Sequence, residues 1–405
     1  MIDKVKMHIA KGGVKELIII TYRFILSRIS PVFMRIMGHF HSDRKIVFSH
    51  FDGKAYGGNP RIICDELIRI KAPYRLVWIT DKRFKGSLPD EVDWVPVNSM
   101  RQLWALSTAK IWIDDCRKSN RFRKNNKQYY IQTWHGGGPC LKKIEADAIS
   151  TLPQTYILDA KNDSEMADLF ISACAWRTKN YREAFWYDGE ILNCGTPASD
   201  IYSKDITSIK KEIYSTFNVN PLKRIVLYAP TFRSDHDTDC YRMDYIQILN
   251  SLKSRFQDEW IIIVRLHPSI MELSDFIKYS DQIINGSLYP QFEDLLISAD
   301  ALITDYSGCM FEAYRLGKKV FIYAPDLHKY VETERDLYFD ITELPADVSL
   351  SDTDLINNIL QFDEDHYNKK VNQFLEDIGY YPFGNATETI VARIKKVIEG
   401  DYDAR

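Results

Sequence analysis

The sequence lacks several features that define large classes of protein. No stretch approaches the about 20 consecutive apolar residues of a membrane-spanning helix, and no internal repeat or low-complexity tract occurs. Lys and Arg number 53 against 56 Asp and Glu, so no surplus of positive charge attracts nucleic acid to the whole molecule. Apolar residues make up 45% and charged residues 27% of the 405 residues. This balance excludes disordered, collagen-like and multi-span membrane proteins and predicts two or three globular domains.

Cysteine is sparse too, and its seven positions form no C-x-x-C pair. Such cysteines are typical of reduced thiols in a cytoplasmic protein, so we expect core residues rather than disulfides or a structural zinc site. Neither the P-loop nor the dinucleotide-binding glycine pattern occurs, because Gly57-Gly58 lacks the required neighbours. Asp114-Asp115 follows a predicted strand, but a lone aspartate pair is more often a turn or a cap than a metal site.

The first 45 residues differ in charge from the rest, with nine Lys or Arg against three acidic residues. The apolar run from Leu17 to Leu26 is broken by Arg23, so it is too short to span a bilayer, and no convincing cleavage site follows it. Apolar residues at helical spacing on both sides of Pro31 instead predict a basic amphipathic segment on an anionic membrane surface. The alternative is a helix packed on the protein's own core.

From Lys45 onward, short apolar runs alternate with amphipathic stretches, the pattern of βα units around a mostly parallel sheet. The first series of expected strands is Lys45–Ser49, Arg75–Ile79, Ile111–Ile113, Tyr129–Thr133, Leu169–Ser172 and Ile191–Asn193. The second is Arg224–Ala229, Trp260–Arg265, Gln282–Asn285, Ala301–Thr304 and Val320–Tyr323. The pattern predicts two Rossmann-like α/β domains that face each other across a cleft.

The expected parts of the chain follow from these two series. A basic amphipathic segment covers 1–45, a first domain 46–205, a linker helix 206–222 and a second domain 223–385. A C-terminal helix is expected within 386–405. Its domain membership is left open, because in folds of this type the last helix often crosses back to the first domain.

Ligands of open α/β sheets bind beyond the carboxyl ends of the strands, so residues that follow a strand are candidates for chemistry. After Tyr129–Thr133 come a histidine, three glycines and a lysine: His135, Gly136, Gly137, Gly138 and Lys142. An imidazole titrates near neutrality and suits a general base for a hydroxyl, and glycines let the backbone approach a ligand closely. A tight turn around a hydrogen-bonded structural histidine explains the same residues equally well.

Strand ends of the second series carry basic, hydroxyl and acidic side chains. These candidates are Thr231, Arg233, Arg265, His267, Thr304, Asp305, Ser307, Gly308 and Glu312. Arginine pairs bidentately with phosphate, and a helix N-terminus binds phosphate through its amides, so this edge suits a phosphorylated ligand. Interdomain ion pairs and simple helix capping are the alternatives for the same side chains.

Four strings occur in this order along the chain: Gln132–Gly136 (QTWHG), Tyr228–Arg233 (YAPTFR), Arg265–Pro268 (RLHP) and Thr304–Ser307 (TDYS). Together they resemble the CDP-glycerol glycerophosphotransferases, which build teichoic acids and related phosphate-linked wall or capsule polymers. The stretches Phe51–Arg61, Gly195–Asp200 and Tyr323–Tyr330 also fit the family. The resemblance covers most of the chain, from about residue 46 to about residue 345.

The resemblance implies a glycosyltransferase-B-like fold and a transfer reaction. Glycerol phosphate or ribitol phosphate would pass from a CDP-linked donor to a hydroxyl of a lipid-linked saccharide or polymer acceptor, with release of CMP. Family members are peripheral on the cytoplasmic face of the cell membrane, which suits the basic segment 1–45. No resident cofactor and no nucleic-acid partner are implied. The alditol, the acceptor, processivity, metal dependence and oligomeric state stay open.

By the same resemblance, His135 takes the role of general base, and His267 contacts or protonates the donor phosphate. Donor binding falls to the second-domain candidates named above, and Gly136, Gly137, Gly138 and Lys142 form an acceptor loop. The chain departs from the family pattern where Gly137, Gly138 and Cys140 widen that loop by two residues. It also departs at three other positions, which hold Ala198, Gly308 and Glu312. The widened loop touches the expected base, so the resemblance to the glycerol-using members leaves both the donor alditol and the acceptor open.

Two other functions fit the same architecture. One is a glycosyltransferase that uses a nucleotide sugar, and the other is a non-catalytic nucleotide-binding subunit of a polymer-assembly complex. The presence of both His135 and His267 favours an enzyme, because a module without chemistry has no use for them.

Overall fold

The computed structural model describes residues 28–40, 42–203, 206–233, 237–267, 270, 276–334 and 336–401. Most of the expected membrane-binding segment, residues 1–27, lies outside these ranges. Its described part is helical from residue 28 to residue 37 and continues into a 3-10 turn, Gly38–Phe40. Met34 packs into the core, whereas Val32 and Phe40 are 61% and 65% exposed. This helix therefore docks on the protein through one side and presents apolar side chains to solvent on another.

The first domain is built on a seven-stranded parallel sheet in the order β3-β2-β1-β4-β5-β6-β7. Its strands are β1 (Ser42–Ser49), β2 (Arg75–Thr80), β3 (Val92–Pro96), β4 (Ala109–Asp114), β5 (Tyr129–Gln132), β6 (Leu169–Ser172) and β7 (Glu190–Asn193). Its helices are α2 (Gly58–Arg69), α3 (Met100–Ser107), α4 (Gln154–Met166) and α5 (Ala175–Ala184). The central strands are buried along most of their length, as expected for a parallel sheet covered on both faces.

The second domain has a six-stranded parallel sheet in the order β10-β9-β8-β11-β12-β13. Its strands are β8 (Arg224–Tyr228), β9 (Trp260–Val264), β10 (Ile283–Asn285), β11 (Ala301–Thr304), β12 (Lys319–Tyr323) and β13 (Val348–Ser349). Its helices are α6 (Ile206–Thr216), α7 (Tyr245–Phe256), α8 (Phe292–Ser298), α9 (Cys309–Arg315), α10 (Leu327–Thr333), α11 (Asp352–Leu360) and α12 (Glu364–Ile378).

Every strand predicted from the apolar runs is present, with ends that differ by a few residues at most. Two further strands were not predicted. Val92–Pro96 carries Asp93 and ends in a proline, which is tolerated because β3 lies at the edge of its sheet. Val348–Ser349 is too short to produce a pattern.

The last helix, α13 (Ala386–Glu399), packs on the first domain although it follows the whole of the second. Its apolar side chains Ile390, Ile394 and Val397 are buried in one cluster with the first-domain strands and α2. Asp200 holds the beginning of this helix by accepting hydrogen bonds from the Ala386 and Thr387 amides. The chain therefore crosses between the domains twice.

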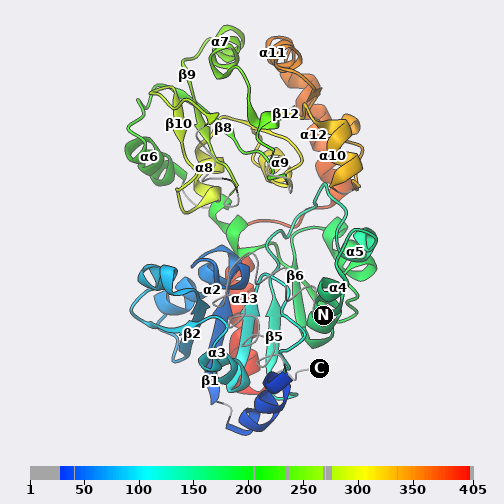
Figure 1. The fold of residues 1–405 in the computed structure, drawn as a ribbon. Coiled ribbons are helices and arrows are strands. Elements are labelled where there is room, and N and C mark those ends of the chain that lie inside the picture. The colour runs from blue at the N-terminus through cyan, green and yellow to red at the C-terminus, as the bar shows by residue number, and fades with distance from the viewer. Residues whose placement is uncertain are drawn as a thin grey trace, which may run out of the picture.

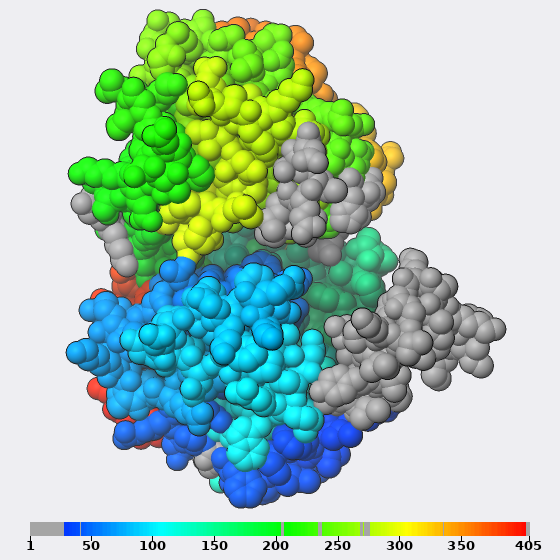
Figure 2. All heavy atoms as spheres, turned by 60° about the vertical axis from the view of Figure 1, so that its left-hand side comes forward, coloured from blue at the N-terminus to red at the C-terminus, as the bar shows by residue number. Residues whose placement is uncertain are grey.

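The two domains stand one above the other (Figure 1), and the surface is recessed between them (Figure 2). This is the arrangement of two Rossmann-like domains that the sequence predicts, and it agrees with the glycosyltransferase-B-like fold that the family resemblance implies. A strap from the first domain bridges the recess: the Tyr338 amide donates to the Leu141 carbonyl at 2.7 Å, and the Lys143 amide donates to the Asp336 carbonyl at 2.8 Å. Leu141 itself is buried in the hydrophobic core of the second domain. The segment after His135 is thus fixed to both domains.

Candidate active site

His135 stands directly beyond the carboxyl end of β5 and is exposed to solvent. Its ring lies against the rings of Trp134 and Phe51, with centroids 4.4 and 5.3 Å away. Trp134 has a φ of 52°, a left-handed conformation that is uncommon for a bulky residue. Strained backbone of this kind is frequent at functional sites. The structure therefore places the predicted base where a strained turn presents it to the recess.

The hydrogen bonding of His135 defines which nitrogen can act as a base. Its Nδ1 lies 3.2 Å from the backbone oxygen of Asp115. A carbonyl only accepts, so Nδ1 carries the proton and Nε2 keeps its lone pair. Desolvation by the surrounding protein lowers the pKa of His135, partly opposed by Asp115, and Arg177 lowers it further. The residue is exposed to solvent, and the rings of Trp134 and Phe51 lie against its imidazole.

The three glycines after His135 have different surroundings. A β-carbon on Gly136 would meet open space, whereas one on Gly137 would lie 2.0 Å from Thr196 Cγ2. A β-carbon on Gly138 would lie 3.2 Å from Glu312 Oε1 of the second domain. The Gly138 carbonyl also accepts a hydrogen bond from Arg177 Nε at 2.8 Å. The glycine loop therefore runs in close contact with both domains.

The loop ends against the beginning of α9. A β-carbon on Gly308, the residue that precedes this helix, would lie 3.6 Å from the Pro139 carbonyl oxygen. Gly308 has no side chain to cap the helix, and the Ser307 hydroxyl accepts a hydrogen bond from the Cys309 amide at 3.4 Å. Glu312 pairs with Arg315 at 3.3 Å, and burial raises the pKa of its carboxyl. The predicted phosphate-binding turn and the predicted acceptor loop are thus neighbours.

Two predicted donor contacts on this edge are occupied by the protein itself. The Thr304 hydroxyl donates to the Ala229 carbonyl at 2.7 Å. The Asp305 carboxylate accepts from the Thr231 amide at 2.7 Å and pairs with Arg233 at 2.9 Å. Both side chains are buried. They shape the strand ends, which leaves Ser307 and Gly308 as the part of this turn open to a ligand.

Arg233 is buried and lies at the centre of an ion-pair network. It pairs with Asp326 as well as Asp305, and its guanidinium lies over the rings of Tyr306 and Tyr330. Its positive charge is therefore already balanced by two neighbouring carboxylates. The buried hydroxyl of Thr231, by contrast, has no hydrogen-bond partner within the described ranges. An unpaired buried hydroxyl is costly, so Thr231 is the better candidate for direct ligand contact.

Arg265 binds backbone carbonyls of its own domain. Its Nη1 donates to the carbonyls of Gly286, Ser287 and Tyr289, at 3.1, 2.5 and 2.5 Å. His267, two residues later, is exposed and stacks on Phe232 with centroids 5.4 Å apart. Of the two candidates after β9, Arg265 holds backbone in place, and His267 is accessible to solvent.

His267 faces the first domain. Desolvation lowers its pKa most, and the positive charges of Lys142, Arg265 and Lys54 lower it further. Lys142 and Lys54 belong to the first domain, and the Lys142 ammonium also lies 4.9 Å from the ring centre of Tyr330 in the second domain. His267 therefore lies where the two domains meet, surrounded by positive charge that suits a phosphate ligand.

Sequence reasoning gave no role in the site to several residues that the structure places near it, although it named Asp115 as part of a turn or cap and Phe51 as part of a stretch that fits the family. His50 and Phe51 follow β1, the neighbour of β4 in the sheet, and Asp115 follows β4. The hydroxyl of Tyr380, from the second crossing between the domains, is buried against Gly138. The strand-end rule applied to β1 as well as β5 would have found His50 and Phe51. No sequence pattern indicated Tyr380, because it comes close to the glycine loop only through the packing of the two domains.

No group of three or more His, Cys, Asp or Glu side chains that could hold a metal ion occurs in the described ranges. All seven cysteines are free thiols. No described helix is long and apolar enough to cross a membrane.

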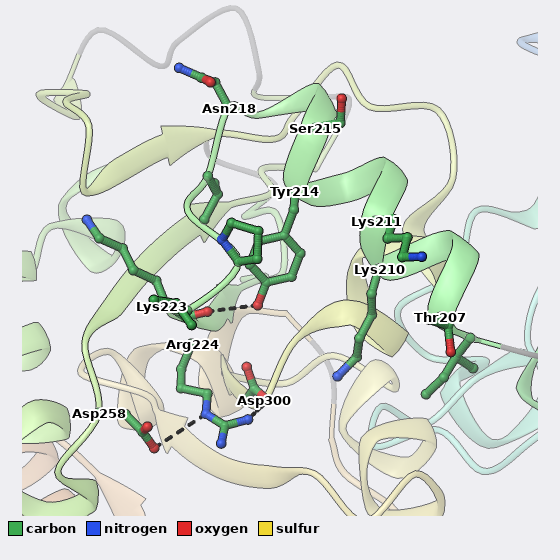
Figure 3. Close-up of a pocket in the computed structure, with 14 residues that line it drawn as sticks. Thr207, Lys210, Lys211, Tyr214, Ser215, Asn218, Lys223, Arg224, Asp258 and Asp300 are labelled. Carbon is green, nitrogen blue, oxygen red and sulfur yellow. Dashed lines mark hydrogen bonds and ion pairs between the residues drawn. The ribbon is translucent and has the colours of Figure 1, made fainter.

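A separate hollow of about 820 Å³ lies at the amino ends of the strands of the second sheet, beside α6 (Figure 3). Arg224, the first residue of β8, pairs there with Asp258 and Asp300 at 3.3 and 3.2 Å. Parallel α/β sheets bind ligands at the carboxyl ends of their strands, and this hollow is at the amino ends. It is therefore not part of the candidate active site.

Comparison with protein families gives a match over residues 32–396. The matching family is described as CDP-Glycerol:Poly(glycerophosphate) glycerophosphotransferase. Among curated proteins, the teichoic acid poly(glycerol phosphate) polymerase of Bacillus spizizenii is 28% identical over 393 residues, which is 94% of this chain and 99% of that protein. The protein of the same name from Staphylococcus epidermidis is 29% identical over 88% of this chain. The chain spans 51% of the length of that relative.

Among solved structures, the wall teichoic acid polymerase TagF has a TM-score of 0.82 and 27% sequence identity, with 96% of each chain covered. TagF has also been solved as variants in which one histidine is replaced by asparagine or by alanine. This TM-score over nearly the full length of both chains shows that the two proteins share the arrangement of both domains as well as the sequence motifs.

Proposed function

The chain belongs to the CDP-glycerol:poly(glycerophosphate) glycerophosphotransferase family, and from this membership we propose how its own residues serve the reaction. It is a transferase that uses a CDP-linked alditol donor. The donated group is glycerol phosphate or ribitol phosphate. The acceptor is a hydroxyl of a lipid-linked or growing polymer in teichoic acid or capsule-type synthesis.

The observation that carries this proposal is the loop from His135 to Lys142. It begins at an imidazole with a free Nε2 lone pair, passes Gly308 at the beginning of α9, and ends at the strap that joins the domains. A hydroxyl deprotonated at His135 therefore lies in the same recess as a diphosphate bound at Ser307 and Gly308. Phosphoryl transfer depends mostly on such positioning and on stabilising phosphate charge.

The proposed step is a direct displacement. The acceptor oxygen attacks the phosphorus of the alditol phosphate, its proton passes to His135 Nε2, and the bond from that phosphorus to the CMP oxygen breaks. CMP leaves with the bonding electrons. His267 donates a hydrogen bond to the donor phosphate, and Thr231, Ser307 and the amides that begin α9 hold the diphosphate. A base in this position is typically worth about 10²–10⁴-fold in rate.

The protein works at the cytoplasmic face of the membrane under this proposal. The described part of the basic segment supports it, because Ile29, Val32, Ile36 and Phe40 are all about half exposed or more. Apolar side chains of this kind enter the headgroup layer, and lysines and arginines nearby attract anionic lipid.

The donor is tested by incubating the protein with a lipid-linked acceptor and with CDP-glycerol, CDP-ribitol or a nucleotide sugar, with and without EDTA. We expect acceptor-dependent release of CMP from one or both CDP-alditols. Release of nucleotide diphosphate from a nucleotide sugar instead would favour a glycosyltransferase. The EDTA arm reports whether a divalent cation takes part.

The base is tested by His135→Ala. Because this change removes the proton acceptor and leaves the proposed diphosphate site in the second domain intact, turnover should fall by about 10²-fold or more while the Kd of the donor changes little. Equal turnover in the wild-type protein and the variant would remove His135 from the reaction.

A further inference from the structure

Asp115 links two histidines at the carboxyl edge of the first sheet. Its carboxylate is fully buried, contacts His50 Nδ1 and accepts a hydrogen bond from the Phe51 amide at 3.0 Å. Its backbone oxygen faces His135 Nδ1 at 3.2 Å. One residue therefore joins the ends of β1 and β4 to the side chain that follows β5.

The glycines at the beginning of α2 make room for this arrangement. Gly58 has a φ of +62°, and a β-carbon there would lie 2.7 Å from His50 Nδ1 and 2.8 Å from Asp115 Oδ2. A β-carbon on Gly57 would lie 3.1 Å from His50 Nε2. Gly57 and Gly58 match no nucleotide-binding motif, and in the structure they accommodate the His50–Asp115 pair.

The same carboxylate holds a strained turn against the base. Phe51 and Asp52 have φ values of 42° and 54°, so both adopt the left-handed conformation that non-glycine residues avoid. The Phe51 amide is anchored by Asp115, and the Phe51 ring contacts the rings of both His50 and His135, with centroids 4.6 and 5.3 Å away. Such a turn persists only where its surroundings fix it.

We propose that His50 and Asp115 position His135 for catalysis, and this inference rests on the role proposed above for His135 as the base. Asp115 fixes the tautomer through its carbonyl, and together with His50 it fixes the place of the imidazole through the Phe51 turn. Neither residue is assigned contact with substrate. A displacement of about 1 Å at a reacting group can cost about 10²-fold in rate, which is why such support matters.

The charge of Asp115 gives the proposal a signature in the pH profile. The ionisable groups that act on the imidazole are Asp115, which follows β4, Arg177 of α5, and His50, which follows β1. The negative charge of Asp115 raises the pKa of His135, and the other two lower it. Removing that negative charge should therefore lower the pKa of His135 and shift the acidic limb of the pH–rate profile to lower pH.

The test compares Asp115→Asn with Asp168→Asn. Asp168 is also a buried carboxylate that accepts a backbone amide, that of Tyr130, and pairs with a cation, Lys124, but it precedes β6 at the opposite edge of the sheet. We expect Asp115→Asn to lower kcat about 10–100-fold, to shift the acidic limb of kcat/KM downward and to leave donor Kd within about threefold. Asp168→Asn should change thermal stability but neither kcat per folded molecule nor the acidic limb.

A second pair of variants keeps the test decisive if Asp115→Asn does not fold. His50→Ala removes the partner of Asp115, whereas His50→Asn keeps a donor near the position of Nδ1. We expect a loss of kcat in His50→Ala and recovery of most of it in His50→Asn. Equal activity of His50→Ala and the wild-type protein would overturn the proposal, as would identical effects of Asp115→Asn and Asp168→Asn on the pH profile.

The tautomer provides a readout that does not need activity. Long-range ¹H–¹⁵N correlation spectra of histidine-labelled protein, with the His135 signals assigned by their absence from His135→Ala, should show a proton on Nδ1. A proton on Nε2 in the resting enzyme would overturn the proposal. Full activity of His135→Ala would instead remove the proposed base, so the two failures are distinguishable.

Discussion

Gly137 lies against Thr196 so closely that a β-carbon on Gly137 would sit 2.0 Å from Thr196 Cγ2. Thr196 is not free to turn away, because its hydroxyl shares a hydrogen bond of 2.6 Å with the Ser199 hydroxyl. This contact fixes the glycine loop to the turn that follows β7, where the chain first crosses between the domains. The width of the loop is thus set by packing as well as by ligand access.

Replacing Gly137 by alanine should destabilise the protein, whereas the same change at Gly136 should not. The clash with Thr196 is expected to cost about 1–3 kcal/mol in the free energy of unfolding. Gly136 faces open space, so Gly136→Ala should stay within about 0.5 kcal/mol of the wild-type protein. Urea unfolding of the two variants measures both values. Equal stability of the two variants would contradict the packing seen here.

Replacing Arg265 should destabilise the second domain rather than weaken donor binding specifically. Arg265→Met leaves three backbone carbonyls without their donor, at an expected cost of about 3 kcal/mol. Arg242→Met is the control, because Arg242 is largely exposed in its pair with Asp239 and should contribute less than about 1 kcal/mol. Unfolding curves measure the loss of stability, and CDP titrations measure the loss of nucleotide binding. A stable Arg265→Met protein that no longer binds CDP would make Arg265 a ligand contact.

Activity should persist below the ordinary pKa of histidine. Desolvation lowers the pKa of both His135 and His267 from 6.5, so both imidazoles stay neutral to lower pH than free histidine does. Protonation of His135 removes the lone pair that accepts the acceptor's proton, so kcat/KM should decline as pH falls, with a midpoint below 6.5. A pH–rate profile from about 4.5 to 9 measures this midpoint. A midpoint above 6.5 would mean that bound charge, not burial, controls the base.

Membrane binding should depend on the exposed apolar face that precedes β1. Val32→Asp combined with Phe40→Asp should reduce sedimentation with anionic liposomes, because both side chains are more than half exposed and would each place a negative charge at the lipid surface. Leu222→Asp is the control, since Leu222 is 84% exposed but lies on the second domain. Higher salt should weaken binding of the wild-type protein, because exposed charges are screened over about 8 Å at physiological ionic strength. Unchanged sedimentation of the double variant would remove this face from membrane binding.

The strands and their order along the chain were predictable because parallel strands buried on both faces appear as short runs of apolar residues. Leu169–Ser172 and Ala301–Thr304 were placed with their observed ends. The edge strand Val92–Pro96 was missed, because an edge strand is only partly buried and tolerates Asp and Pro. The candidate residues could also be predicted, because they follow the carboxyl ends of strands, and in a parallel sheet these ends lie together on one side.

The sequence did not separate residues that bind a ligand from residues that organise the strand ends. Arg233 and Arg265 resemble phosphate-binding residues by type and position, yet Arg233 pairs with Asp305 and Asp326, and Arg265 binds carbonyls of the segment after β10. Their partners are distant in sequence, and no local pattern identifies them. His50 was overlooked because the strand-end rule was not applied to β1, and its pairing with Asp115, which follows the neighbouring strand β4, has no local signature.

The sequence by itself determined the two parallel sheets, the family resemblance and the presence of imidazoles at two strand ends, because each of these depends on local pattern or on residue type at a strand terminus. Only the tertiary structure decided which nitrogen of His135 is free, which arginines are already paired, and that the loop after His135 reaches the beginning of α9. These properties arise from contacts between segments far apart in the chain, and such contacts exist only once both domains have packed around the crossing segments and α13.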